Sequence, residues 1–90
     1  MKHLTIKVYG TVQGVFYRHT AQRCARELGI RGKIGNQQDG SVTIEAEGDE
    51  TSLDAFVEWC KKGSPSAKVD HVEVTEGAVE QYSFFQISNE

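Results

Sequence analysis

Hydrophobic and polar positions alternate in two stretches of the chain and recur at helical spacing in two others. Leu4, Ile6 and Val8 alternate with polar residues, and residues 41–47 do the same. A period of two predicts half-buried strands in both stretches. A spacing of three to four residues predicts two amphipathic helices. Their apolar positions are Ala21, Cys24, Ala25 and Leu28 in the first helix and Leu53, Phe56, Val57 and Cys60 in the second.

Turn residues mark the limits of the other elements. Gly29 is placed to end the first helix. Residues 31–38 lead into Asp39-Gly40, a pair that is typical of a two-residue hairpin. Lys61, Lys62 and Gly63 close the second helix. The sequence therefore predicts a strand before Asp39 that pairs with the strand after Gly40.

The C-terminal third predicts one more long strand and one short one. Residues 69–75 read as the fourth strand, in which Val69 is out of phase with Val72 and Val74, so that a bulge or a late start of the strand is expected. Residues 84–87 read as a short fifth strand, and residues 77–83 as an exposed loop.

This order of elements predicts an α+β fold, a ferredoxin-like βαββαβ sandwich. We expect an antiparallel sheet of four to five strands with two helices on one face, because right-handed crossovers place both helices on the same side. The other face is expected to be open to water. Ninety residues are enough for a single domain, residues 1–90, with a modest core.

The segment from Gly10 to Arg18 joins the first strand to the first helix and contains two glycines. A helix N-terminus carries unpaired N–H groups and a partial positive charge, so a cation there is disfavoured by about 0.3–1 kcal/mol. Arg18 and His19 nevertheless stand there, and no Ser, Asp or Asn precedes them as a cap. A bound anion explains this arrangement. In the alternative reading Thr20 caps the helix, Gly14 serves a turn and Arg18 is solvated.

Charge and composition exclude several partners. The net charge of −3 and the pI near 5.6 argue against broad binding to nucleic acid or to an anionic membrane. The third strand directs Thr43, Glu45 and Glu47 to the open face and so offers no ring on which an RNA base stacks, and on the first strand only Tyr9 could serve. No apolar signal segment or membrane-spanning stretch is found, so we expect a cytoplasmic protein.

Histidines and cysteines give no pattern of a metal centre. His3, His19 and His71 are scattered and read as surface residues, and no Cys or His pair has ligand spacing. Cys24 and Cys60 fall on apolar helix faces, which favours buried, reduced thiols. A disulfide between them remains an alternative if the helices pack side by side.

Several short motifs together carry a resemblance to a known family. They are Gly10-x-Val12-Gln13-Gly14-Val15-x-x-Arg18, Leu28-Gly29-x-x-Gly32-x-x-x-Asn36, Asp39-Gly40-x-Val42, Glu45-x-x-Gly48, Gly63-x-Pro65-x-Ala67-x-Val69 and Phe85-x-Ile87. In this set the chain resembles the acylphosphatase family along nearly its whole length. The sequence departs from the family's usual pattern at Phe16-Tyr17, Lys33 and Gly35.

The resemblance implies an enzyme that hydrolyses the carboxyl–phosphate bond of acyl phosphates to carboxylate and inorganic phosphate without metal or cofactor. It implies that Arg18 binds the phosphate and that Asn36 positions water. Phosphate binding is expected from the loop residues Gln13, Gly14, Val15, Phe16, Tyr17 and Arg18. We expect a monomer that meets a small-molecule substrate and no nucleic acid or membrane.

A non-enzymatic function is the alternative. A ferredoxin-like module can keep the same loop and use it to bind a small anion, or can recognise a partner through its open sheet face. Asn36 separates the two functions, because an anion binder does not need a residue that aligns water.

Overall fold

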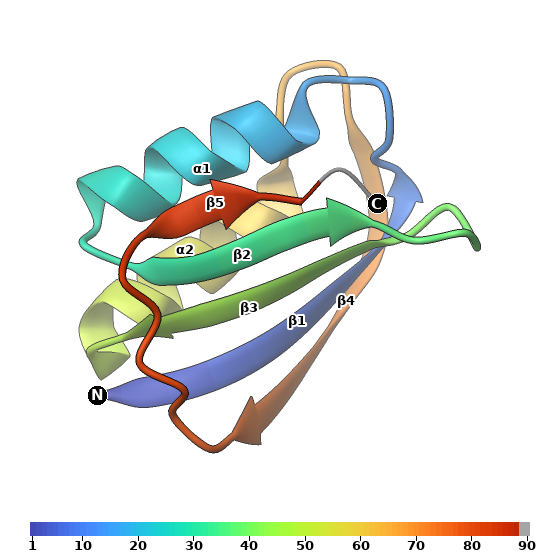
Figure 1. Ribbon diagram of the computed structural model, residues 1–90. Coiled ribbons are helices and arrows are strands. Elements are labelled where there is room, and N and C mark those ends of the chain that lie inside the picture. The colour runs from blue at the N-terminus through green and yellow to red at the C-terminus, as the bar shows by residue number, and fades with distance from the viewer. Residues whose placement is uncertain (89–90) are drawn as a thin grey trace.

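The computed structural model describes residues 1–88, in which two helices pack on one face of a five-stranded sheet (Figure 1). The elements in chain order are β1 (Lys2–Thr11), α1 (Tyr17–Glu27), β2 (Arg31–Asn36), β3 (Val42–Gly48), α2 (Glu50–Lys62), β4 (Lys68–Gly77) and β5 (Phe85–Ile87). The core lies between the sheet and the helices. It contains the inward residues of the strands, such as Ile6, Ile34 and Ile44, and the helix residues Ala21 and Phe56.

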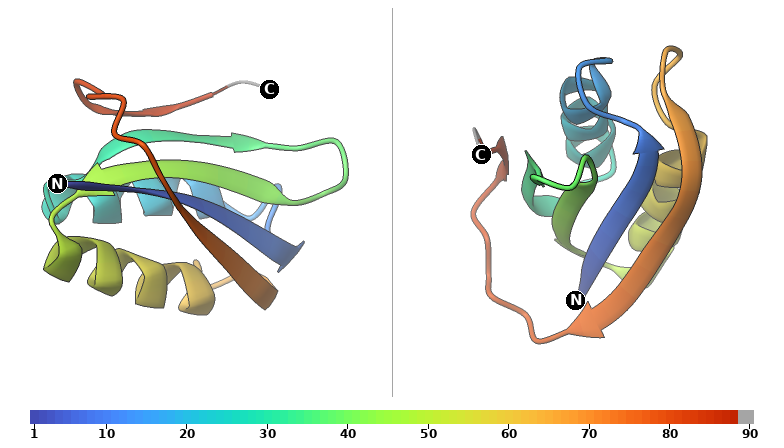
Figure 2. Two further views of the ribbon diagram at one scale, coloured as in Figure 1. Left: turned by 90° about the horizontal axis from the view of Figure 1, so that it is seen from below. Right: turned by 90° about the vertical axis from the view of Figure 1, so that its right-hand side faces the viewer.

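The strand order is β4-β1-β3-β2-β5, and all pairs are antiparallel except β2 with β5. The predicted ferredoxin-like fold is therefore confirmed. The expectation of a wholly antiparallel sheet is wrong for its last strand. After β4 the chain passes one end of the sheet to the opposite edge (Figure 2) and runs back beside β2 in the same direction.

The predicted bulge is also confirmed. The pairing of β1 with β4 shifts between Tyr9 and Gly10, so that Tyr9 faces His71 and Gly10 faces Val69. Asp70 is the extra residue, which is why Val69 is out of phase with Val72 in the sequence.

The helix ends follow the sequence signals. Leu28 is the C-cap of α1, and Gly29 follows it with a φ of 73°. At the start of α2 the Asp49 carboxylate accepts a hydrogen bond from the Ser52 N–H. The hairpin differs from expectation, because Asp39-Gly40 lies within a connection of five residues, 37–41, and not in a two-residue turn.

The thiols are free, as expected. Cys60 is buried, and this burial raises the pKa of its thiol to about 12, whereas Cys24 is half-buried. No disulfide joins the two helices in the structure, and the reduced state of the two thiols stays a prediction.

The prediction of surface positions for His3 and Glu47 is wrong. Their side chains are only 3% and 1% exposed, and His3 Nδ1 lies 2.7 Å from Glu47 Oε2. The loop after β4 covers this part of the open face, since the N–H groups of Glu80, Gln81 and Tyr82 donate to the Glu47 carboxylate. The loop residues are themselves largely exposed, but they bury the pair beneath them.

Candidate active site

The loop between β1 and α1 leaves its backbone donors without protein partners. Gly14 and Phe16 have φ angles of 73° and 60°, and such left-handed residues turn successive N–H groups toward one point. The N–H groups from Gly14 to His19 find no acceptor among residues 1–88. The first turn of α1 holds no acidic residue, and its N-cap, Phe16, makes no side-chain cap. These donors and the helix dipole together favour an anion at this end of α1.

Arg18 brings a cation to this loop. It lies in the first turn of α1, and its Nη1 donates to the Ser88 carbonyl at 2.9 Å. The Ser88 N–H in turn donates to the Ile34 carbonyl of β2 at 2.7 Å. A Cβ on Gly35 would lie 3.1 Å from the Ser88 Cβ, so glycine gives Ser88 the room to approach. The guanidinium is thereby connected to the last residues of β2.

Asn36 is the last residue of β2 and holds a buried, unpaired acceptor. Alternation along the strand places it on the same face as Ile34, the face that the helices cover. Its Oδ1 is buried and has no hydrogen-bond partner among the described residues. Such an orphaned oxygen costs about 1–3 kcal/mol, so it is a natural acceptor for a water or another O–H donor.

Gln13 ties the loop to the hairpin that follows Asn36. Its Nε2 donates to the carbonyls of Gln37 at 2.8 Å and Ser41 at 2.9 Å. In Figure 1 the loop before α1 and the end of β2 accordingly lie at the same end of the sheet, opposite the N-terminus. Arg18 and Asn36 are thus brought to one end of the molecule from two different elements.

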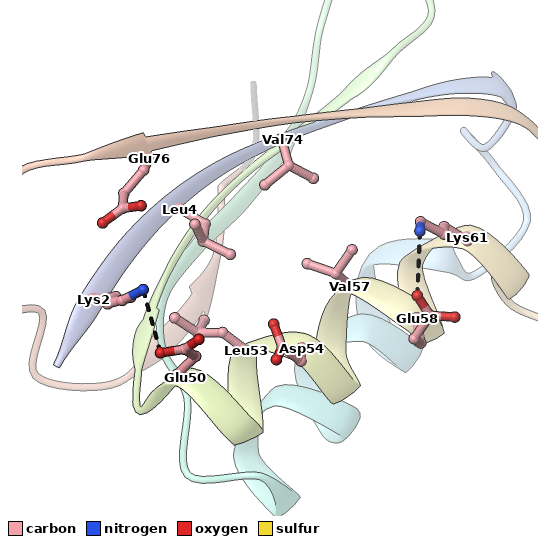
Figure 3. A pocket seen from close by; sticks show the side chains of 10 residues that line it. All are labelled: Lys2, Leu4, Glu50, Leu53, Asp54, Val57, Glu58, Lys61, Val74 and Glu76. Atoms are coloured by element: carbon pink, nitrogen blue, oxygen red, sulfur yellow. Dashed lines mark hydrogen bonds and ion pairs between the residues drawn. The ribbon is translucent and has the colours of Figure 1, made fainter.

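Two hollows on the surface differ in charge. A hollow of about 230 Å³ is lined by Gly14, Phe16 and Arg18 with three neighbouring residues. A hollow of about 450 Å³ lies between α2 and the β1–β4 edge (Figure 3), with four carboxylates and two lysines around it. Both lysines are already paired, Lys2 with Glu50 at 3.4 Å and Lys61 with Glu58 at 3.2 Å. Charge therefore favours the smaller hollow as the place for an anion.

Comparisons with known proteins identify the family of this chain. The acylphosphatase family profile matches residues 4–87. An acylphosphatase of Thermotoga maritima is 47% identical over 87 residues, covering 97% of both chains. An acylphosphatase of Methylococcus capsulatus is 48% identical over 79 residues, covering 88% of this chain and 86% of that protein. The chain belongs to the acylphosphatase family.

A solved structure of a family member shares the whole architecture. The acylphosphatase of Bacillus subtilis superposes with a TM-score of 0.95 at 42% identity, covering 98% of this chain and 99% of that one. The family and the enzyme class predicted from the sequence are both confirmed.

Within the acylphosphatase loop, the predicted binding residues take different positions. Tyr17 points into the core, with its ring 1% exposed and its hydroxyl donating to the Cys60 carbonyl at 2.9 Å. Burial raises the pKa of Tyr17 above its usual range. The Gln13 amide is engaged by the carbonyls of Gln37 and Ser41. Phe16, by contrast, is 77% exposed.

The alternative reading of Thr20 as the helix cap is wrong. The helix begins at Tyr17, and Thr20 donates both its N–H and its hydroxyl to the Phe16 carbonyl, at 3.1 and 2.9 Å. Because both Thr20 hydrogen bonds go to the Phe16 carbonyl, Thr20 does not cap the helix, and the N–H groups at the start of α1 stay available for a ligand.

Two residues that support the acylphosphatase loop were not predicted from the sequence. The buried Ser64 donates its hydroxyl to the Val15 carbonyl at 2.9 Å, and Ser88 offers its carbonyl to Arg18. The Ser88 contact uses a backbone atom and leaves no signal in the residue type. Ser64 follows Gly63 at the end of α2, where a polar residue is ordinary.

Proposed function

We propose that this acylphosphatase binds the phosphoryl group of an acyl phosphate with Arg18 and the loop N–H groups, and that Asn36 aligns the attacking water. The observation that carries this assignment is the buried, unpaired Asn36 Oδ1, which lies at the same end of the sheet as the uncapped loop. An acceptor and a set of free donors are the two parts that hydrolysis at phosphorus requires.

The loop stabilises the charge that develops on the phosphoryl group. Phosphoryl transfer through a loose transition state demands mainly positioning and stabilisation of the equatorial oxygens. The Arg18 guanidinium is a planar fork of donors that matches two such oxygens, and N–H groups at a helix N-terminus add fixed partial charges. These groups are set before the substrate arrives, because Ser64, Thr20 and Gln13 already hold the surrounding backbone.

Asn36 positions the nucleophile. Its Oδ1 accepts from a water O–H while its Nδ2 donates to a phosphoryl oxygen, which holds the water in line with the P–O bond to the acyl group. The water oxygen bonds to phosphorus, that P–O bond breaks, and the electron pair leaves with the carboxylate. The water proton passes to a phosphate oxygen.

A carboxylate leaving group makes further chemistry unnecessary. It departs as a stable anion, so the proposed reaction runs without a general acid, a metal or a cofactor. We further propose a cytoplasmic monomer that binds no nucleic acid and no membrane. Neither helix of the described chain has the length and apolar character needed to span a bilayer.

Hydrolysis of acetyl phosphate with excess chelator tests the assignment. We expect wild-type turnover to survive chelation, Arg18→Ala to lower kcat/KM by about 10³-fold and Asn36→Ala to lower kcat by about 10²-fold. The exposed Arg23→Ala on the same helix and Gln38→Ala beside the hairpin are matched controls that retain wild-type rates.

The same experiment separates catalysis from anion binding. Phosphate binding without turnover in the wild type would favour the non-catalytic anion-binding or partner-interaction module. Loss of activity on chelation, reversed by a divalent metal, would contradict the metal-independent reaction.

A further inference from the structure

Phe16 combines unusual exposure with an unusual backbone. At 77% it is the most exposed large hydrophobic side chain of residues 1–88. Its φ of 60° and ψ of 19° lie in the left-handed region, which bulky side chains rarely adopt. A solvated ring on a strained backbone contributes little to the stability of the fold, so the position of Phe16 needs another explanation.

The residues around Phe16 hold its backbone in place. The Val15 carbonyl before it accepts from the Ser64 hydroxyl at 2.9 Å, and its own carbonyl accepts from Thr20. Tyr17 after it is anchored in the core through its hydroxyl bond to the Cys60 carbonyl. The ring therefore stands on a fixed base and is not part of a freely moving loop.

The ring borders the hollow in which the phosphate is proposed to bind. Phe16, Gly14 and Arg18 line the same hollow of about 230 Å³. An acyl phosphate whose phosphoryl group contacts Arg18 and the loop N–H groups must direct its acyl group out of this hollow. Phe16 supplies a large apolar surface there, next to the cation that holds the phosphate.

We propose that Phe16 contacts the acyl group and makes the enzyme prefer acyl phosphates whose acyl group is aromatic or a large apolar group. This inference rests on the proposed function, because it requires the phosphate in the loop. Paired aromatic rings gain about 0.5–1.5 kcal/mol beyond their buried area, which corresponds to roughly 2- to 12-fold in binding. The contact is remote from the breaking bond and is present before and during the reaction, so it lowers KM and leaves kcat unchanged.

A comparison of benzoyl phosphate with acetyl phosphate tests this inference. We expect Phe16→Ala to raise the KM for benzoyl phosphate by roughly 3- to 10-fold more than the KM for acetyl phosphate, with the kcat for the two substrates changed by the same factor. Phe16→Leu keeps apolar bulk without the ring and is expected to give an intermediate KM for benzoyl phosphate. Phe84→Ala is the matched control, because Phe84 is 59% exposed and does not line the hollow.

The outcomes separate this inference from the function on which it rests. Failure of the wild type to hydrolyse either substrate would overturn the proposed function itself. If the wild type turns over both substrates and Phe16→Ala raises both KM values by the same factor, Phe16 only shapes the loop. If Phe16→Ala leaves the KM and kcat for both substrates unchanged, the ring contacts neither acyl group. Either result overturns the acyl contact. Should Phe16→Ala not fold, the ratio of the two KM values in Phe16→Leu distinguishes the same outcomes.

Discussion

Polar groups are paired with one another at one end of the sheet and lack protein partners at the other end. At the end where β1 begins, His3 lies between Glu45 at 2.6 Å and Glu47 at 2.7 Å, and Glu47 accepts three further N–H donors from the loop after β4. At the end where β1 stops, the loop N–H groups and the Asn36 oxygen have no protein partners among residues 1–88.

This difference distinguishes a structural cluster from the proposed binding site. Buried polar groups that satisfy each other hold the fold together, whereas groups left unsatisfied cost stability until a ligand completes them. Polarity and burial alone therefore do not identify the site in this chain. The proposed site is distinguished instead by its unsatisfied donors and its unsatisfied acceptor.

The largest effect is expected from Glu47→Ala. The substitution removes the acceptor of the buried His3 Nδ1 and of the N–H groups of residues 80–82, and removal of one partner from a buried charged pair costs about 3–5 kcal/mol. We expect chemical denaturation to show a loss of this size in the free energy of unfolding. The kcat of the protein that remains folded stays unchanged, since the cluster lies at the far end of the sheet.

Glu45→Ala is the matched control for Glu47→Ala. Glu45 also pairs with His3, but it is 21% exposed, so its loss is expected to cost about 1 kcal/mol. Equal losses in the two variants would contradict the view that burial and the backbone donors make Glu47 the centre of the cluster.

At the other end of the sheet, Arg18→Lys is expected to change activity and leave stability intact. Lysine keeps the charge but loses the planar fork that matches two phosphoryl oxygens, and we expect kcat/KM to fall by about 10²-fold, or about 2.7 kcal/mol. The free energy of unfolding should stay within about 0.5 kcal/mol of the wild type, as for other substitutions near the surface. Arg23→Lys on the exposed side of α1 controls for the exchange. Full activity in Arg18→Lys would mean that charge alone is sufficient.

Most of the fold was predictable because local patterns encode it. Alternation at Leu4, Ile6 and Val8 and helical spacing around Phe56 each depend on which face is buried, and the structure confirms those faces. The direction of β5 was not predictable. It depends on where the chain goes after β4, and three residues of strand contain no signal for the neighbour with which they pair.

The sequence predicted the residues of the proposed site but not the buried pair of His3 and Glu47. Arg18 and Asn36 lie in motifs, and the missing helix cap before Arg18 is visible in the sequence. His3 and Glu47 are 44 residues apart, and the alternation of β3 assigns Glu47 to the open face. Glu47 is buried because the loop of residues 80–82 covers it and donates backbone N–H groups to its carboxylate. Backbone contacts of this kind leave no signal in the residue types.

Asn36→Leu tests whether the unpaired oxygen costs stability. Replacing an unsatisfied buried polar group with an apolar group of similar size removes its desolvation penalty, so we expect the free energy of unfolding to rise by about 1 kcal/mol. Hydrolysis should fall by about 10²-fold in the same variant, as in Asn36→Ala, because neither side chain can hold water. A loss of stability instead would mean that Asn36 serves the fold, as Glu47 does.

The smallest effect is expected in the pH dependence of stability. Burial would lower the pKa of His3, but its hydrogen bonds to Glu47 and Glu45 outweigh this and raise the pKa above its ordinary value. Burial would raise the pKa of Glu47, but the N–H donors and His3 lower it. Both directions favour an ion pair.

The sign of this dependence follows from the two shifts. The contribution of His3 is complete below its unfolded pKa of about 6.5 and is lost as the pH rises through the folded value. The contribution of Glu47 is present above about 4.3 and is lost as the pH falls through its folded value. Measured by denaturation from pH 5 to 9, the stability advantage of the wild type over His3→Asn should therefore be largest near pH 5–6 and shrink toward pH 9. The exposed His19→Asn, compared with the wild type in the same way, controls for the loss of a histidine outside the cluster. An advantage that grows with pH would mean that His3 is neutral in the folded protein and that the satisfied end of the sheet is held by Glu47 and the backbone alone.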